Sequence, residues 1–300
     1  MIITSSEIGF DISISDLSDM MPVDSAVNQR AIALITTVLL LFSTTLPAND
    51  DISWSYGIGV GALSLDDYRG SARRNDYLLP FPYLRLKSKR LAIDENGLHG
   101  RLAVIPNARL EMSMAAGIPV AADKNQLRQD MPGLAPSFEI GPALEMTIST
   151  STDGNRELVI NLPFRAAFTV SGFTIRHQGW ILSPFIEYRL HFGRPEPWRL
   201  GIAAGPIYAD RRYHDYYYGV EPEYSTLTRP TYSATAGYSG YRVTVTLAKR
   251  QGQYWYGMFA RYDNLAGATF TDSPLVETDD YLAAGMAVAC ILGGSGMRNY

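Results

Sequence analysis

Residues 138–148, with the sequence FEIGPALEMTI, alternate apolar side chains with polar or small ones at every step. Successive side chains of a β-strand point to opposite faces, so Phe138, Ile140 and Leu144 share one face, and Glu139 and Glu145 share the other. An amphipathic helix would repeat its apolar positions every three or four residues instead. The segment therefore predicts a strand with one fully apolar face and one charged or small face.

The same period of two recurs on both sides of this segment, and sustained helical spacing is hard to find. At about 21 residues per tilted strand and turn, residues 49–300 have room for about twelve strands. Turn-rich stretches separate the candidates at 65–76, 121–136, 149–155, 192–197, 213–230 and 266–280. The strands that we expect are 56–62, 78–90, 97–106, 109–118, 138–148, 158–168, 172–181, 186–192, 199–208, 241–249, 254–262 and 281–292.

Two architectures fit such alternation: a soluble β-sandwich or ligand-binding barrel, and a transmembrane barrel. The polar faces carry Gly, Ala, Glu and Arg while every strand keeps a full apolar face, which favours the transmembrane barrel. Only a closed barrel satisfies every backbone group of a β-sheet in lipid. Aromatic residues near strand ends are typical of an interfacial girdle; they are Tyr77, Phe81, Tyr83, Trp180, Phe185, Tyr188, Phe192, Trp198, Tyr208, Tyr254, Trp255, Tyr256, Tyr262 and Tyr281. We expect an all-β, transmembrane antiparallel β-barrel of about twelve strands.

Residues 31–48 lack charge, and their apolar centre of about a dozen residues follows Arg30. This length is typical of a secretory signal peptide and is short for a membrane-spanning helix, which is the alternative. We expect cleavage after Ala48, giving a leader and signal peptide at 1–48 and an outer-membrane barrel at 49–300. The acidic stretch 1–29 does not suit an export signal, so residues 1–20 are interpreted as an over-long start, with initiation at Met20 or Met21.

Composition excludes several classes of function. The formal charge of −4 gives no basic surplus for a nucleic-acid backbone. Cys290 is the only cysteine, so an intramolecular disulfide and a structural zinc site with paired thiolates are ruled out. The histidines at 99, 177, 191 and 214 have no pair at helical metal-ligand spacing. We expect no cofactor and no metal.

Three segments resemble a known family. The first is Tyr68-Arg69-Gly70-Ser71, followed by Tyr77, Pro80, Pro82 and Tyr83. The second runs from Tyr216-Tyr217-Tyr218-Gly219-Val220 through Tyr224 and Arg229-Pro230 to Tyr232, Ala234 and Gly237. The third is Arg261-Tyr262-Asp263-Asn264-Leu265, followed by Asp272-Ser273-Pro274-Leu275-Val276. In this order and spacing they are similar to the MipA/OmpV family of Gram-negative outer-membrane proteins, across nearly all of residues 51–292.

The resemblance implies a barrel in the outer membrane. For the name-giving member it implies a scaffold that joins a lytic transglycosylase to a peptidoglycan synthase, so a murein hydrolase and a murein synthase are the expected partners beside outer-membrane lipid. Other members are discussed as porin-like, adhesive or stress-responsive proteins. The chain departs from the usual pattern at its end, because residues 293–300 follow Leu292 where barrels of this type finish in a strand with a terminal aromatic residue.

The charged faces supply the candidate site. An Arg on the lipid side at mid-bilayer costs ~2–4 kcal/mol, so charged residues on strands should face the lumen. There they act either as charge rings that set the selectivity of a pore or as ion pairs that plug a narrow barrel, and we favour the plug. The six residues are Glu139, Glu145, Arg165, Glu187, Arg189 and Arg242.

Four tyrosines on an expected loop are a second candidate: Tyr213, Tyr216, Tyr217 and Tyr218. Their amphipathic rings suit contact with a protein or glycan, and equally a loop that rests on the barrel rim. Asp210, His214 and Asp215 could supply a general base for a hydrolase, but a polar extracellular loop explains them as well and no serine has a nucleophile-elbow context. We therefore expect a non-enzymatic scaffold without catalytic residues, with a porin-like channel for ions or small solutes as the first alternative and an outer-membrane hydrolase as a distant one.

Overall fold

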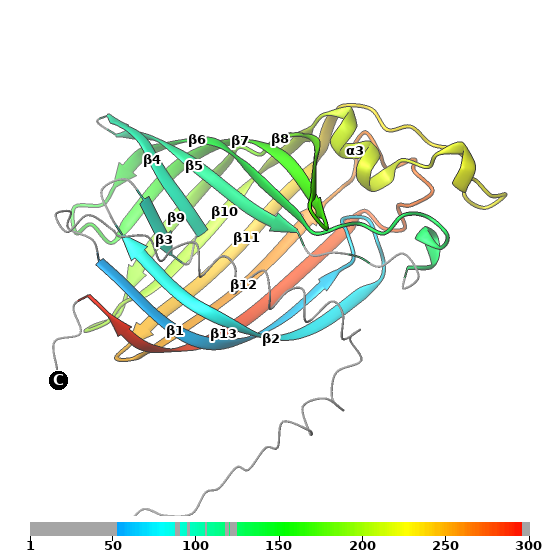
Figure 1. The fold of residues 1–300 in the computed structure, drawn as a ribbon. Coiled ribbons are helices and arrows are strands. Elements are labelled where there is room, and N and C mark those ends of the chain that lie inside the picture. Colours follow the sequence, from blue (N-terminus) through cyan, green and yellow to red (C-terminus); the bar gives the residue numbers. More distant parts are fainter. Residues whose placement is uncertain are drawn as a thin grey trace, which may run out of the picture. The chain divides into compact units, whose positions relative to one another are not determined.

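A computed structural model describes residues 53–87, 91–94, 97–105, 107–117, 120 and 125–295. The expected signal peptide, its cleavage at Ala48 and the early start codon lie outside these residues. The described part is dominated by antiparallel strands (Figure 1). They are β1 (Ser53–Asp66), β2 (Arg74–Lys87), β3 (Leu91–Asp94), β4 (Gly97–Ile105), β5 (Ala108–Gly117), β6 (Ser137–Thr150), β7 (Arg156–Ser171), β8 (Thr174–Leu182), β9 (Phe185–Phe192), β10 (Trp198–Ala209), β11 (Gly237–Gln251), β12 (Tyr254–Asn264) and β13 (Asp280–Gly294).

The strands close into a ring. Each pairs with the next along the chain, and β13 returns to pair with β1 from Leu65↔Ala283 to Ser55↔Gly294. β8 and β9 occupy one position, because both pair with β7, β8 along its second half and β9 along its first. The thirteen described segments thus fill twelve positions, which confirms the expected fold and strand number.

The structure corrects two details of the expected strand order. The segments 172–181 and 186–192 were expected as two separate strands, but they form one interrupted strand with Ser183 and Pro184 at the break. Proline has no N–H for the ladder, which explains why pairing stops there. The short β3, which pairs with the end of β2 and with β4, was not expected and supplies the remaining position.

The barrel exposes apolar side chains and buries charged ones. Ile58 is 63% exposed and Met286 is 66% exposed, whereas Glu145 is 5% exposed and Asp263 is fully buried. A soluble sandwich would reverse this distribution, because its apolar faces form the core. The outward apolar surface therefore favours the transmembrane barrel over the soluble alternative.

The expected aromatic girdle is wrong for some of its members. Tyr83 and Tyr281 are buried, and Tyr83 packs against Trp255 at 5.7 Å between ring centroids. Phe81 joins the same cluster. Alternation explains the error. Tyr83 and Phe81 pair with the inward Gly57 and Gly59 of β1, and Tyr281 has the same parity as the inward Gly285 on β13, so these rings face the lumen. Tyr254, Tyr256 and Tyr262 have the opposite parity on β12 and are exposed.

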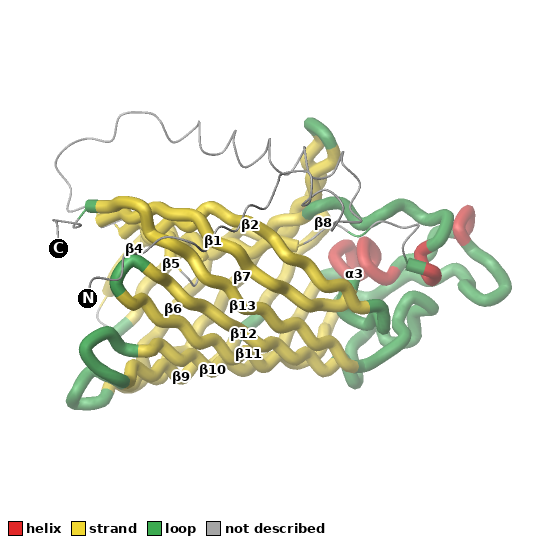
Figure 2. Tube along the Cα trace, turned by 90° about the horizontal axis from the view of Figure 1, so that it is seen from below, coloured by secondary structure: helices red, strands yellow, loops and turns green. Residues whose placement is uncertain are grey.

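The two ends of the barrel differ (Figure 2). Short turns at 151–155, 193–197 and 252–253 connect the strands at one end, where β1 begins and β13 ends. Long connections gather at the other end and include a helix, α3 (Arg211–Tyr218), within a stretch expected to be an irregular loop. Asp210 caps this helix by accepting a hydrogen bond from the Tyr213 N–H at 2.9 Å.

No helix in the described part of the chain combines the length and apolar character needed to cross a membrane.

Candidate functional site: the lumen and the lid

Glu145 is the centre of an ion-pair network on the inner wall. Arg109 Nε donates to Glu145 Oε1 at 2.7 Å, and Arg189 Nη2 donates to Glu145 Oε2 at 2.9 Å. Arg189 Nη2 also donates to Glu187 at 2.6 Å. The network links β5, β6 and β9, and because only β7 lies between β6 and β9, it runs along the inner wall across neighbouring strands.

A second network ties α3 to the wall. Arg165 Nε donates to Glu139 Oε2 at 3.0 Å, and its guanidinium also reaches Ser113 and Ser183 at 3.3 and 3.2 Å. Tyr213 on α3 donates its hydroxyl hydrogen to Glu139 Oε1 at 3.2 Å. The carboxylate of Glu139 therefore connects the strand wall to the helix that lies above it.

Asp263 forms ion pairs with three arginines. Arg242 and Arg261 each contact its carboxylate through two nitrogens, at 2.9 and 3.0 Å and at 2.9 and 2.6 Å respectively. Arg69, from the connection between β1 and β2, makes an ion pair through Nε at 2.7 Å. One carboxylate thus faces three guanidinium groups, which leaves a local surplus of positive charge at the junction of the wall and the long connections.

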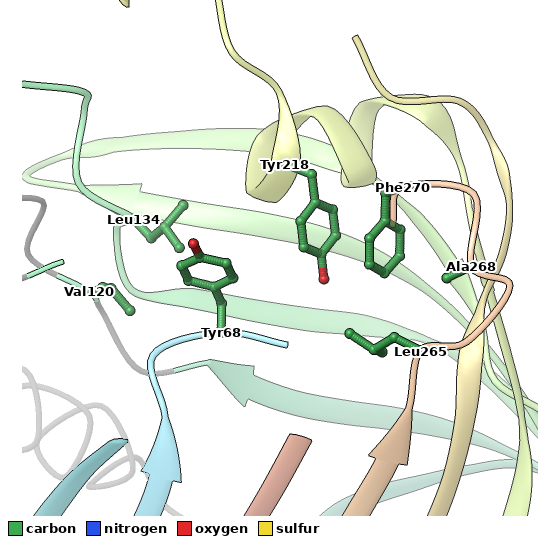
Figure 3. Packing of buried hydrophobic residues seen from close by; sticks show 7 residues of the cluster. All are labelled: Tyr68, Val120, Leu134, Tyr218, Leu265, Ala268 and Phe270. Atoms are coloured by element: carbon green, nitrogen blue, oxygen red, sulfur yellow. The ribbon is translucent and has the colours of Figure 1, made fainter. Parts of the chain in front are cut away.

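We call the described residues of four connections the lid, namely 67–73, 120 with 125–136, 210–236 and 265–279. They share a hydrophobic core (Figure 3). The Tyr218 and Phe270 rings stack with their centroids 3.7 Å apart. The core consists of Tyr68, Val120, Leu134, Tyr218, Leu265, Ala268 and Phe270. Segments that are far apart in the sequence therefore form one packed structure over this end of the barrel.

Hydrogen bonds from side chains to backbone carbonyls hold the lid connections together. Tyr68 donates its hydroxyl hydrogen to the Leu275 carbonyl at 2.8 Å, and Tyr218 donates to the Arg69 carbonyl at 2.9 Å. Arg229 donates to the carbonyls of Leu127 and Tyr224, at 2.7 and 2.8 Å. Burial raises the pKa of the Tyr68 and Tyr218 hydroxyls, so these donors stay protonated at neutral pH.

The three motifs of the sequence resemblance meet in this place. The first supplies Tyr68 and Arg69, and the second supplies Tyr218. The third supplies Asp263, which binds Arg69, and Ser273, which donates to the Tyr218 carbonyl at 2.7 Å. The motif residues therefore build the lid and its attachment to the barrel wall.

His214 is fully buried beneath the lid. Its Nδ1 lies 2.6 Å from the Thr235 carbonyl, which can only accept, so Nδ1 carries the hydrogen and Nε2 accepts from the Ser239 hydroxyl at 3.1 Å. Burial lowers the pKa of His214, which keeps the ring neutral. Ser239 is also fully buried, so this serine–histidine pair has no exposed atom to offer a substrate.

Asp210 and Asp215, which were expected to act with His214, make other contacts. Asp210 caps α3. Asp215 accepts from Arg211 at 3.1 Å and from the Ala234 N–H at 2.6 Å. Asp210, His214 and Asp215 therefore do not form the acid–base set that the hypothesis of a general base at His214 requires.

The four candidate contact tyrosines lie within the lid. Tyr218 is buried in its core, and Tyr213 points to Glu139 in the lumen. The Tyr216 hydroxyl oxygen accepts a hydrogen bond from the Ala135 N–H at 2.8 Å, and the hydroxyl donates to the Ala135 carbonyl at 3.4 Å. Tyr217 packs on Tyr213 at 5.1 Å between centroids. Of the two interpretations of these rings, this geometry favours a loop that rests on the barrel rim.

Two cavities occupy the lumen. One, of about 550 Å³, is lined by five of the six charged residues expected there, namely Glu145, Arg165, Glu187, Arg189 and Arg242. The other, of about 380 Å³, is lined mainly by β12, β13, β1 and β2 with a charged margin from β9 and β10. Within the described residues, no group of His, Cys, Asp and Glu is arranged to hold a metal ion.

Sequence reasoning missed Ser239, and it noted Arg69, Arg261 and Asp263 only as parts of the family motifs. Arg261 and Asp263 stand on either side of the exposed Tyr262 on β12. Because successive side chains of a strand point to opposite faces, this alternation indicates that both residues face inward. No local signal marks Arg69 or Ser239, because both act through contacts with distant segments.

A closed antiparallel barrel with an apolar outer wall and a charged inner wall defines a β-barrel of the outer-membrane class. The model of the family described as MltA-interacting protein MipA matches residues 58–290, and the chain belongs to this family. The protein is accordingly an outer-membrane β-barrel protein. The sequence-based assignment of family, fold and location is confirmed.

Solved structures share the architecture only distantly. The outer-membrane protease OmpT of Escherichia coli matches at 9% identity and a TM-score of 0.29, over 84% of this chain and 98% of that one. OpdO of Pseudomonas aeruginosa matches at 10% identity and a TM-score of 0.27, over 81% and 97%. A porin matches at 10% identity and a TM-score of 0.28, over 81% and 100%. No curated protein matched the chain.

Proposed function

We propose that this protein is a non-enzymatic scaffold of the outer membrane that binds peptidoglycan-remodelling enzymes, a lytic transglycosylase and a murein synthase, at its periplasmic end. The observation that carries the proposal is membership of a family described as MltA-interacting. We infer that the outer wall contacts outer-membrane lipid, and that the mature chain begins after Ala48 once the signal peptide is removed.

The lid and the lumen networks support a platform rather than an open conduit. Glu145, Arg189 and Glu187 cross-link the wall, and Tyr213 fixes α3 over it. Such side-chain contacts narrow the open cross-section of the lumen, which a channel needs, and they also make the barrel more rigid. We therefore propose that the six charged lumen residues form a plug, and that the four lid tyrosines hold the lid in place.

The short-turn end is where the proposed partners would bind. In outer-membrane barrels the short turns face the periplasm, where peptidoglycan enzymes act. The turns 193–197 and 252–253 form a continuous surface, because Glu196 accepts hydrogen bonds from the Gly252 N–H at 3.1 and 3.2 Å. Most residues of these turns are exposed, including Arg194, Pro195 and Gly252.

Binding to a purified MltA-type lytic transglycosylase tests the proposal. One variant replaces Arg194-Pro195-Glu196 with Gly-Ser-Gly. A matched control replaces the exposed turn Gly172-Phe173 at the lid end with Asn-Gly. Barrel folding of both is checked by heat-modifiable electrophoretic mobility. We expect the first variant to lose transglycosylase binding and the control to keep it. Equal binding by both folded variants, or no binding by the parent protein in a nanodisc, would contradict the proposal.

A porin-like channel is the alternative that one observation favours. The cavity of about 550 Å³ is lined by four arginines, Arg109, Arg165, Arg189 and Arg242, against the acids Glu111, Glu145 and Glu187. This lining has an excess of positive charge, so a channel through it would prefer anions.

A further inference from the structure

The three arginines around Asp263 carry more charge than this carboxylate neutralises. Asp263 is fully buried and supplies one negative charge, whereas Arg69, Arg242 and Arg261 supply three positive charges. Among the described residues, no other carboxylate forms an ion pair with any of these guanidinium groups. The cluster therefore has a surplus of two positive charges.

The protein has no other means of removing this surplus. Asp66 forms an ion pair with Arg74 at 3.0 Å, and Glu139 forms one with Arg165 at 3.0 Å, so these two acids are already balanced. An arginine side chain keeps its proton in proteins, which excludes neutralisation by proton loss. Charge that is withdrawn from water without a partner is costly. A mobile anion is the remaining counter-charge.

Two of the three arginines have donors to spare. Arg69 has none, because its Nε pairs with Asp263 at 2.7 Å and its Nη1 and Nη2 donate to the hydroxyl and the carbonyl of Ser239. Arg242 and Arg261 each use only Nε and Nη2 to bind Asp263. The Nη1 atom of each makes no hydrogen bond with a described residue.

These two arginines stand at the edge of a lumen cavity. Each side chain is 26% exposed, whereas Asp263 is fully buried. Arg242 lines the cavity of about 550 Å³, and so does Thr244. Thr244 shares the inner face of β11 with Arg242 and pairs in register with Arg261 on β12, the neighbouring strand (Figure 1). Two guanidinium groups and one hydroxyl therefore occupy adjacent positions on the inner wall.

The charge of this group selects a phosphate-type dianion. A phosphate group carries about −1.5 to −2 charges at neutral pH, which matches the surplus of two. A carboxylate or a halide would balance only half of it. Guanidinium groups also donate pairs of parallel hydrogen bonds to phosphate oxygens. The cavity volume of about 550 Å³ lies within the roughly 300–1,000 Å³ of small-ligand sites, so a phosphate with a small organic substituent also fits.

We propose that Arg242, Arg261 and Thr244 bind a phosphate dianion in the lumen, either as orthophosphate or as the terminal group of a small phosphomonoester. The bound dianion neutralises the charge surplus around Asp263. This site does not depend on the scaffold function, because it lies near the lid and the proposed partner surface lies at the short turns.

Isothermal titration of orthophosphate at pH 8 into the full-length protein in nanodiscs tests the site, with empty nanodiscs subtracted. One saturable site per barrel is expected, and nitrate, a monoanion, should bind at least about tenfold more weakly. Glucose 6-phosphate distinguishes the two sources: tighter binding than orthophosphate indicates a phosphomonoester, and weaker binding indicates orthophosphate. No saturable binding of either phosphate, or equal binding of nitrate, overturns the proposal.

Variants locate the site once heat-modifiable mobility shows that they fold. Arg242→Gln and Arg261→Gln should each weaken orthophosphate binding about tenfold, because each removes a charged donor, and Arg242→Lys should restore part of it. Arg109→Gln is the matched control, since it removes a positive charge from the same cavity but from the Glu145 network, and it should bind normally.

Equal weakening by Arg109→Gln would assign binding to the general charge of the lumen and overturn the site. Unchanged binding in folded Arg242→Gln and Arg261→Gln also overturns it. If neither of these variants folds, the comparison of orthophosphate with nitrate in the parent protein decides.

Discussion

Arg69 and Asp263 join the lid to the barrel wall: the arginine lies in the connection after the first strand, the aspartate lies on the twelfth, and their charged atoms are 2.7 Å apart. Asp263 also binds Arg242 and Arg261. One fully buried carboxylate is therefore the counter-charge for three arginines, and the attachment of the lid depends on it.

Asp263→Asn should destabilise the barrel by about 3–5 kcal/mol, because it leaves three guanidinium groups without a counter-charge in a buried site. The free energy of unfolding by urea in lipid vesicles, followed by tryptophan fluorescence, measures the change. The exposed Asp272→Asn is the control and should change it by less than about 0.5 kcal/mol. Equal stability of the two variants would show that the lid is held by its apolar core alone.

Phe270→Ala should open the lid and leave the barrel folded. Phe270 is fully buried against Tyr218 and His214, and removal of such a ring costs about 3–5 kcal/mol. Hydrogen exchange should accelerate in 210–236 and 265–279, while exchange in the strands stays slow. The exposed Leu227→Ala should leave all rates unchanged. Faster exchange in the strands would mean that lid and barrel unfold as one unit.

Acid should loosen the lid through His214. Its folded pKa lies below the ordinary value of 6.5 because burial disfavours the charged ring. The hydrogen bond to the Thr235 carbonyl opposes this shift, as do Asp210 and Asp215, while Arg69 acts in the same direction as burial. The opened lid therefore binds the proton more readily, so lid stability is complete above pH 6.5 and falls as the pH drops through the folded pKa. Hydrogen exchange in 210–236, corrected for its intrinsic pH dependence, measures this.

His214→Asn provides the comparison for that measurement, because an amide N–H can replace the Nδ1–H donor to Thr235 without titrating. In this variant the acid-dependent increase in lid exchange should be absent. An equal increase in the parent protein and the variant would assign the effect to another group.

The channel alternative makes its own prediction about conductance. If the lumen conducts, the parent barrel in planar bilayers should prefer anions, and Arg242→Gln or Arg189→Gln should shift the reversal potential toward cations. The exposed Arg176→Gln should not shift it. Folded protein that conducts no ions would rule out the channel and agree with the plug formed around Glu145.

Alternation identified most of the barrel because lipid and lumen impose opposite demands on successive residues. The expected strand 138–148 lies within β6, and 241–249 lies within β11. The interrupted strand of β8 and β9 was not recognised as one element, since the break at Pro184 is a local signal for two strands and only the shared partner β7 shows otherwise.

The lid could not be predicted from local patterns. Tyr68, Leu134, Tyr218 and Phe270 lie in four separate connections, and each of these looks like a polar loop when its sequence is considered alone. Only the family motifs marked Tyr68, Tyr218 and Leu265 as a related set. The structure gives the physical reason: Tyr68, Tyr218 and Leu265 pack in the same hydrophobic core.

The stacked pair of Tyr218 and Phe270 and its neighbour Tyr68 also bear on the order of assembly. Tyr68 follows β1 and Phe270 precedes β13, so we expect the lid core to form only after the first and last strands have met. Contacts of such long sequence separation form late, because the closure entropy of the intervening chain must be overcome first. A compact lid thus reports a completed barrel, and a protease that cuts open lids would remove unfinished molecules and spare finished ones.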